Sequence, residues 1–292
     1  MRSAIGSIAL KKEGSMPWDK SLLLKLAVVI LAAYASAGAE MPGGVFPFGI
    51  AYMAAASKRS RMSIYLLPAV LGGIAVRIST GAEIIGDGAA VLLVAFVFLV
   101  TGKKAFADWH RIVIAASSAV ICNVIYFTAA DLLYKFNPRQ MPMEIAAIAV
   151  AYFIFDKAGD LLFSQEKIKE ETKEIAVVAI CAAVSVILCG IVPTFASEAA
   201  LGGGFLVVAL LGYRFGISSG VTGAASAALS FYFCGFADVS GIYAFLAIGM
   251  CTGIFKGLNK YTAALVFAAI GALLGNVLPA TGAAVLFALV PE

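Results

Sequence analysis

The sequence predicts an all-α integral membrane protein, a polytopic helix bundle with about 10–12 transmembrane or re-entrant segments. Composition gives the first reason, because 62% of the residues are apolar, 13% are charged and the mean hydropathy is +0.99. Too few polar residues remain to cover a water-soluble domain. The second reason is that sixteen of the 21 lysines and arginines fall in every second gap between apolar runs. Basic residues stay on the cytoplasmic side of a membrane, so this alternation is typical of a chain that crosses back and forth.

The apolar runs define the predicted helices in order. A helix needs roughly 20 apolar residues to cross the hydrocarbon, or somewhat fewer where long basic side chains flank it. Residues 43–56 and 202–213 are shorter or glycine-rich, and 280–290 is short for a crossing. The predicted segments are 21–38, 43–56, 63–76, 88–101, 112–129, 145–155, 175–192, 202–213, 217–235, 241–255, 261–278 and 280–290.

Charge sets the predicted orientation of the chain in the cell membrane. The N-terminal segment 1–20 carries four basic residues and is expected in the cytoplasm. The charges fix the sidedness as far as Lys260, but they leave open whether 280–290 returns the C-terminus to the cytoplasm. The apolar run after the basic N-terminus, with the triplet 35–37 of small residues, also fits a cleavable signal peptide, and this alternative stays open.

The longest hydrophilic stretch separates two predicted membrane halves, 21–163 and 175–292. Between them, 164–174 is predicted to be a charged cytoplasmic connector. Its glutamates recur at four-residue spacing with lysines between them, which is typical of an exposed helix. It is therefore the candidate surface for a soluble partner. The residues of this surface are Glu166, Lys167, Lys169, Glu170 and Lys173.

A segment rich in proline and glycine is a candidate broken or re-entrant helix. Proline removes a backbone donor and glycine loosens the turn, as in helices that are interrupted inside a membrane. The alternative, which the pattern favours, is a short helix entered through a turn. The residues concerned are Pro42, Gly43, Gly44, Pro47 and Gly49.

Glycines at four-residue steps run through the second half. Residues at this spacing lie on one face of a helix, where glycine lets neighbouring backbones approach closely. Packing within the chain is favoured over self-association, although the pattern fits both. The predicted packing glycines are Gly212, Gly216, Gly220, Gly249, Gly253, Gly257, Gly271 and Gly275.

The sequence carries no signature of an enzyme. It contains no phosphate-binding loop and no His-Glu-x-x-His helix. The five cysteines occur singly and His110 is the one histidine, so neither a metal site nor a cofactor is predicted. Nucleic-acid binding is not expected either, because the basic residues are spread among loops and form no single stripe.

Ionisable residues near the apolar runs form two groups, one beside the connector and one in a glycine-rich gap on the predicted outer side. Neither group lies at the middle of a predicted span, where an ionisable side chain would indicate a pathway. Snorkelling or local pairing is expected to satisfy the group beside the connector, so no ion pathway is predicted. The groups are Asp156, Lys157 and Asp160, and Arg77, Glu83 and Asp87.

Four segments carry a family pattern: PFGIAYMAA at 47–55, LLGYRFGISSGVTGAASAAL at 210–229, AIGMCTGIFKGLNKYTAALVFAAIGALLGNVL at 247–278 and AAVLFALVPE at 283–292. With them the chain resembles the membrane region of stage II sporulation protein E, the polytopic phosphatase of endospore-forming bacteria. The resemblance spans most of the chain, and its motifs are glycine and apolar patterns. In that family a phosphatase domain follows the membrane region. Its aspartates have no counterparts in 1–292, so no catalytic residue carries over.

The resemblance implies a non-catalytic membrane domain for localisation, scaffolding and self-association during sporulation. It implies three kinds of partner, namely the lipid bilayer, a second copy of the chain and proteins of the division septum. It also implies an even number of crossings with both termini in the cytoplasm. The alternative is a small-solute membrane transporter or a substrate-binding membrane component, which the two-half layout and the candidate broken helix suggest.

Overall fold

The computed structural model describes residues 20–59, 65–76, 84–101, 106–132, 138–163, 172–192 and 196–291. These ranges contain twelve α-helices and no β-strand beyond one isolated bridge, which confirms the predicted all-α bundle. The helices are α1 (Lys20–Ala37), α2 (Pro47–Arg59), α3 (Leu67–Ala75), α4 (Ile84–Thr101), α5 (Asp108–Ala129), α6 (Gln140–Phe163), α7 (Lys173–Ile191), α8 (Ser197–Phe215), α9 (Ile217–Phe233), α10 (Val239–Ile254), α11 (Lys260–Leu273) and α12 (Val277–Leu289).

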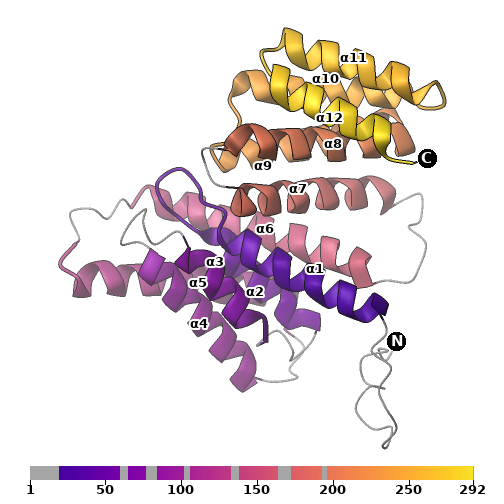
Figure 1. Cartoon of the computed structure of the whole chain (residues 1–292). Helices are drawn as coiled ribbons and strands as arrows, with labels where there is room; N and C mark the ends of the chain where they lie inside the picture. Colours follow the sequence, from indigo (N-terminus) through magenta and orange to yellow (C-terminus); the bar gives the residue numbers. More distant parts are fainter. Residues whose placement is uncertain are drawn as a thin grey trace, which may run out of the picture.

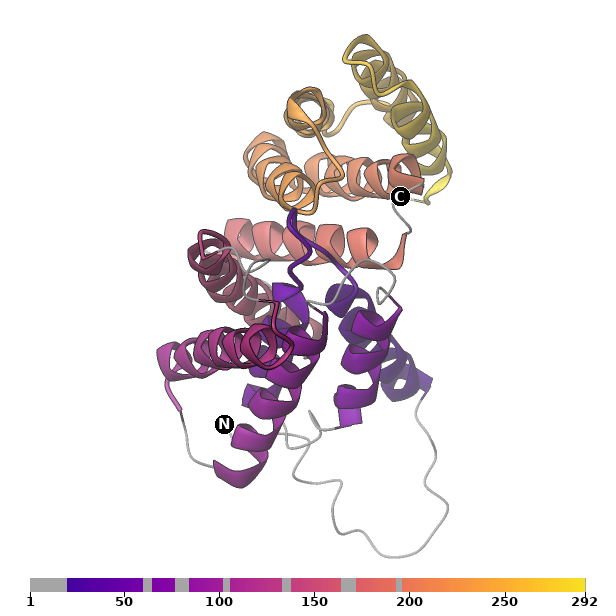
Figure 2. The ribbon, with the colours of Figure 1, turned by 90° about the vertical axis from the view of Figure 1, so that its left-hand side faces the viewer.

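The helices form two groups that meet at α7 (Figure 1). Helices α1 to α6 make up one group, and α8 to α12 stack on the other side of α7, as both Figure 1 and Figure 2 show. Helix α7 packs against α8 and α9 in its own half of the chain and against α1 and α6 in the other half. The two halves are therefore in direct contact through α7.

Glycines allow α1 to cross α3 and α7 at close range. A methyl group at Gly73 would overlap the carbonyl oxygen of Tyr34, and one at Gly190 would overlap that of Ala35. Both carbonyls belong to the last turn of α1, which is held between its two neighbours. Backbone contact of this kind is favoured where the solvent is apolar and helices gain little from burying larger side chains.

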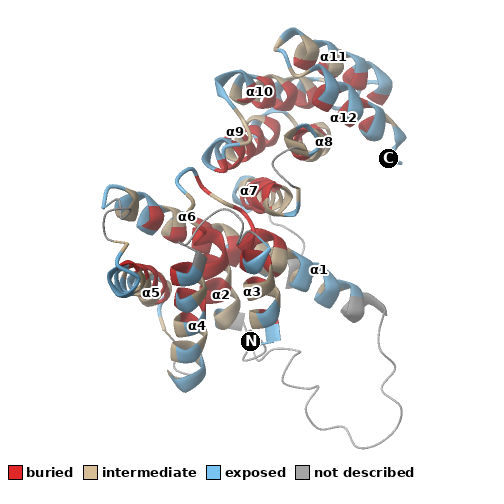
Figure 3. Cartoon of the chain, turned by 60° about the vertical axis from the view of Figure 1, so that its left-hand side comes forward, coloured by how far each residue is buried: buried red, intermediate tan, exposed pale blue. Residues whose placement is uncertain are grey.

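The outer surface of the bundle is apolar. The buried positions are rich in alanine and phenylalanine, while many large aliphatic side chains point outward. Figure 3 shows buried residues along the inner faces of the helices and exposed residues along the outer faces. Apolar exposure on this scale is unfavourable in water and is expected of a surface that contacts lipid. Examples are Leu92, Phe96, Leu99, Leu265 and Leu273.

Three helices, α5, α7 and α8, are long and apolar enough to be candidate membrane spans. Five other apolar stretches in the described residues are shorter, at 10–17 residues. A helix of 13 residues such as α12 is about 20 Å long, against about 30 Å of bilayer hydrocarbon. The helical membrane character of the chain thus follows from α5, α7 and α8, and the full number of crossings stays a prediction.

Candidate functional site

Glycines bring α8, α9 and α10 into backbone contact. A methyl group at Gly220 would overlap the carbonyl oxygen of Gly249, and one at Gly249 would overlap that of Gly220. A β-carbon at Gly212 would lie 3.1 Å from the same Gly249 oxygen, and one at Gly253 would lie 2.5 Å from the Cα of Ile217. These four glycines form the glycine seam. The helix faces that carry these glycines are covered by other helices of the same chain.

Three of the predicted packing glycines have another role. Gly216, Gly257 and Gly275 follow the ends of α8, α10 and α11 with φ angles of 102°, 86° and 83°. The prediction that they lie on helix faces is wrong, because four-residue spacing does not reveal where a helix stops. Glycine is favoured after a helix end since it adopts positive φ without a steric penalty. Gly271, by contrast, packs on a helix face, where a methyl group would overlap the β-carbon of Ala280.

The proline- and glycine-rich segment is a turn followed by a short helix, not a broken helix. Gly43 and Gly44 have φ angles of 104° and 83°, and the amide of Met41 donates to the carbonyl of Val45 across the turn at 2.9 Å. After Pro42 and this turn, α2 begins at Pro47, where proline is tolerated because the first helical amide has no partner within the helix. Gly49 lies inside α2, and its β position is 3.0 Å from the Cβ of Ala37 in α1.

Most of the predicted partner surface on the connector lies outside the described residues, including Glu166, Lys167, Lys169 and Glu170. Lys173 is described and begins α7. Its ammonium group lies 5.4 Å from the centre of the Phe215 ring, in a cation–π contact with the end of α8. This residue is therefore engaged within the bundle.

One end of the second half gathers basic side chains and is termed here the basic end. The ammonium of Lys260, at the start of α11, donates to the carbonyl of Val290 and lies 5.3 Å from the Phe287 ring centre. The Tyr213 hydroxyl, near the end of α8, donates to the carbonyl of Leu258 at 2.8 Å. The ends of α8 and α12 therefore lie beside the loop that joins α10 to α11. Arg214 and Lys256 belong to the same end.

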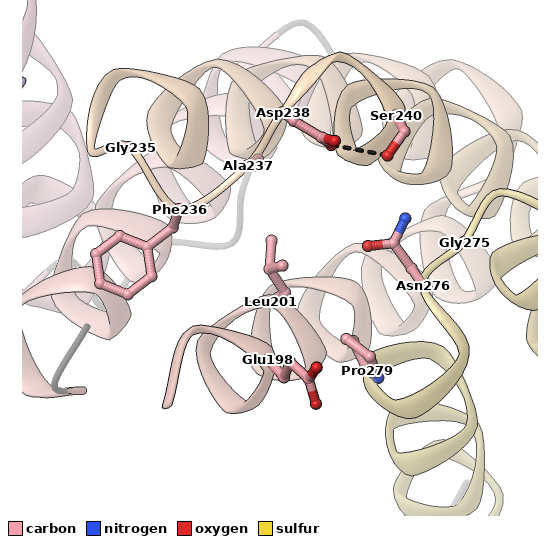
Figure 4. A pocket seen from close by; sticks show the side chains of 10 residues that line it. All are labelled: Glu198, Leu201, Gly235, Phe236, Ala237, Asp238, Ser240, Gly275, Asn276 and Pro279. Atoms are coloured by element: carbon pink, nitrogen blue, oxygen red, sulfur yellow. Dashed lines mark hydrogen bonds between the residues drawn. The ribbon is translucent and has the colours of Figure 1, made fainter. Parts of the chain in front are cut away.

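The opposite end of the second half carries a pocket of about 410 Å³. Figure 4 shows Asp238 and Ser240 on one wall, Glu198 on another, and Leu201 and Asn276 between them. The remaining lining residues are Gly235, Phe236, Ala237, Gly275 and Pro279. The lining includes two carboxylates and no lysine or arginine, so the pocket is negatively charged, and we term this the acidic end.

Asp238 is the N-cap of α10 and has a structural task in this pocket. Its Oδ1 accepts hydrogen bonds from the amide of Gly241 at 2.8 Å and from the hydroxyl of Ser240 at 2.7 Å. These donors, the Gly241 amide foremost, hold the pKa of the Asp238 carboxyl below its ordinary value. The carboxylate therefore stays charged and supports the helix start at all but strongly acidic pH.

In the first half, an ion cluster joins α2, α5 and α6. The ammonium of Lys58 lies 2.9 Å from a carboxylate oxygen of Asp108 and 2.9 Å from one of Asp156. Tyr152 donates its hydroxyl to Asp108 at 2.9 Å, and the Asp156 side chain is only 1% exposed. These four residues form the Lys58 cluster. Burial lowers the pKa of Lys58, but the hydrogen bonds that its ammonium donates to the two carboxylates, together with their charges, outweigh this effect and the pKa is raised.

Sequence reasoning placed Asp156 beside a charged loop, satisfied locally, and missed its partner. Lys58 is 98 residues away in the chain, and the pair forms only because α2 packs on α6. No spacing rule connects residues so far apart. A lysine at the end of one apolar run and an aspartate near the end of another give a weak signal at best.

Comparison with known proteins finds no relative of the chain. No family model matches the chain, no curated protein matches it, and no solved structure matches it. The described residues also contain no group of three or more His, Cys, Asp or Glu side chains placed to hold a metal.

Proposed function

We propose that the chain is a non-catalytic, multi-pass membrane anchor with both of its ends on the cytoplasmic side. The apolar outer surface and the three candidate spans support a position within the bilayer. The close glycine contacts support a rigid bundle, which suits an anchor better than a protein that must open and close.

The contact between Lys260 and Val290 carries the proposal for the C-terminal side. It brings the end of α12 beside the start of α11. The loop before α11 is the last gap between apolar runs that carries basic residues. Basic loops are retained in the cytoplasm, so the end of α12 is proposed to lie there too. The acidic pocket, at the other end of the same helices, then faces outward.

Cysteine labelling tests this orientation with one position at each end of the second half, the half-buried Asn276 in the pocket and the exposed Leu258. In a version of the chain without its native cysteines, we expect Asn276→Cys to react with a membrane-impermeant maleimide in intact cells. Leu258→Cys is expected to react only after the membrane is permeabilised. Equal labelling of the two positions in intact cells, or the reverse order, would contradict the orientation.

The biological role proposed for this anchor is localisation and scaffolding at the sporulation septum, with self-association of the chain. The support is the pattern shared with the membrane region of stage II sporulation protein E. We expect a fluorescently tagged chain to concentrate at the septum during sporulation. Uniform membrane fluorescence throughout sporulation would rule out this role while leaving the anchor topology intact.

The acidic pocket favours a second candidate function, a membrane component that binds or transports a small cationic solute. Its volume of about 410 Å³ is within the range of small-molecule sites. For this function we expect a cationic solute to raise the melting temperature of the purified chain, with the rise lost in Glu198→Gln. No rise across a broad panel of amines and metabolites would leave the anchor as the better account.

A further inference from the structure

Two side chains of the basic end carry positive charges that no acid of the described ranges compensates. Arg214, in the last turn of α8, and Lys256, in the loop after α10, are both exposed. No hydrogen bond or ion pair joins either side chain to another residue in the part of the chain that the structure describes. The Lys256 ammonium lies 3.8 Å from the β position of Gly216, which follows Arg214 by two residues. The two basic residues therefore belong to adjoining helix ends.

A third basic residue of the basic end is buried against neutral partners. Lys260 is 7% exposed, and its ammonium contacts the carbonyl of Val290 and the ring of Phe287. Neither of these groups neutralises the charge. A buried ammonium without a counterion is unfavourable, and negative charge nearby stabilises it. The basic end therefore favours an anionic ligand.

The remaining charges of the second half leave this asymmetry in place. Glu174 lies beside the basic end, where its carboxylate accepts a hydrogen bond from the hydroxyl of Ser218. The adjacent Lys173 offsets its charge. At the acidic end, the pocket contains Glu198 and Asp238 and no basic side chain among its lining residues. The second half is thus positive at one end and negative at the other.

Exposed apolar side chains adjoin the basic residues. Ile217 directly follows Gly216, and Ile254 precedes Lys256 by two residues; both side chains are exposed. The ring of Tyr261, at the start of α11, is 65% exposed. Tyrosine is enriched at the level of the lipid headgroups, where its ring meets apolar chains and its hydroxyl meets water. A positive rim next to an apolar surface fits a lipid, whose phosphate is joined to acyl chains, better than it fits a soluble anion.

We propose that Arg214 and Lys256 bind the phosphate of an anionic phospholipid in the cytoplasmic leaflet. A guanidinium binds phosphate through paired hydrogen bonds, and an ammonium binds it as a point charge. Each lysine or arginine near an anionic membrane surface strengthens binding about fivefold. The choice of leaflet rests on the proposed function, because it requires the basic end to face the cytoplasm. The lipid binding itself does not depend on that orientation.

The competing explanation is that these charges only set the orientation of the chain during insertion. Charge in any cytoplasmic loop would serve that purpose equally, and no lipid would be preferred. A binding site instead predicts a preference for anionic lipid that depends on Arg214 and Lys256 and not on basic residues elsewhere.

Native mass spectrometry of the purified full chain distinguishes the two explanations. The chain is released from detergent with equal amounts of phosphatidylglycerol and phosphatidylcholine that have the same acyl chains. We expect about 25-fold greater retention of phosphatidylglycerol, because two basic residues contribute. Arg214→Gln and Lys256→Gln should each lower this preference about fivefold, whereas Lys256→Arg should keep it. The matched control is Lys157→Gln, which removes an exposed lysine of the first half and should leave the preference unchanged.

Two further measurements exclude a loss of folding and a soluble ligand. The melting temperatures of Arg214→Gln and Lys256→Gln should equal that of the native chain, because both side chains are exposed. Inorganic phosphate in excess should leave the lipid bound, as sodium chloride at the same ionic strength does. Three results would each overturn the proposal: equal retention of the two lipids, a loss in Lys157→Gln as large as that in Lys256→Gln, or displacement of the lipid by inorganic phosphate.

The outcome is separable from that of the cysteine labelling. Retention is measured in detergent, where neither end of the chain has a side, so equal retention of the two lipids would refute the lipid site and leave the anchor topology intact. Reversed labelling would refute the cytoplasmic leaflet and leave the lipid preference intact.

Discussion

Replacing Gly249 with leucine is expected to prevent the second half from folding correctly. The β-carbon alone would overlap the carbonyl oxygen of Gly220, which belongs to the backbone of α9 and cannot move without displacing that helix. Even Gly249→Ala should lower the free energy of unfolding by about 3 kcal/mol or more, at the upper end of what overpacking costs. The measurement is the melting temperature of the purified chain, read from the exposure of Cys181 and other buried thiols.

A matched control exists on α12. Gly282 is also inside a helix, but a β-carbon there would meet no atom within 4 Å. Gly282→Ala should stabilise the chain by about 0.5–1 kcal/mol, because alanine favours the helix over glycine. The two substitutions add the same methyl group and are expected to change stability in opposite directions. If both lower the melting temperature equally, close backbone packing at Gly249 is not the cause.

The class of fold could be predicted from the sequence because it depends on properties that add along the chain. Apolar content and helix length are local, so the all-α bundle and most of its segments followed directly. The predicted segment 145–155 is shorter than the observed helix, because α6 (Gln140–Phe163) extends beyond the apolar run at both ends. Its extension includes Asp156, whose charge interrupts the apolar pattern but is compensated by Lys58.

The glycine pattern shows where local reasoning ends. The spacing correctly drew attention to Gly220 and Gly249, although it did not indicate that they touch each other. The same spacing also predicts a packing role for Gly275, although that residue follows the end of α11 and has a positive φ. A repeat of four residues is compatible with both roles, and only the path of the chain separates them.

The polar groups inside the first half could not be paired from sequence at all. A single asparagine in an apolar run does not indicate a partner, yet Asn123 lies between two buried carboxylates. Asp87 was assigned to an outer gap, and the structure places it 1% exposed within the bundle. Such pairings depend on which helices pack together, and no spacing along the chain encodes that.

Replacing Lys58 with methionine is expected to destabilise the first half by about 3 kcal/mol. Removing one partner of a buried ion pair leaves the other charge buried and uncompensated. This costs about 3–5 kcal/mol when both groups are buried. The Lys58 side chain is 35% exposed, so water and salt screen part of the effect and the lower value applies. The measurement is again the melting temperature of the purified chain.

Substitutions at the two acids separate the buried pair from the exposed one. Asp108 is 40% exposed and can be hydrated, so Asp108→Asn should cost only about 1 kcal/mol. Lys58→Met combined with Asp156→Leu should recover much of the loss, because no uncompensated charge remains. The pKa of Lys58 is raised above its ordinary 10.5, so the stabilisation is complete below that pH and fades as the pH rises through the higher value. A double variant no more stable than Lys58→Met alone would show that lost packing, and not the buried charge of Asp156, causes the effect.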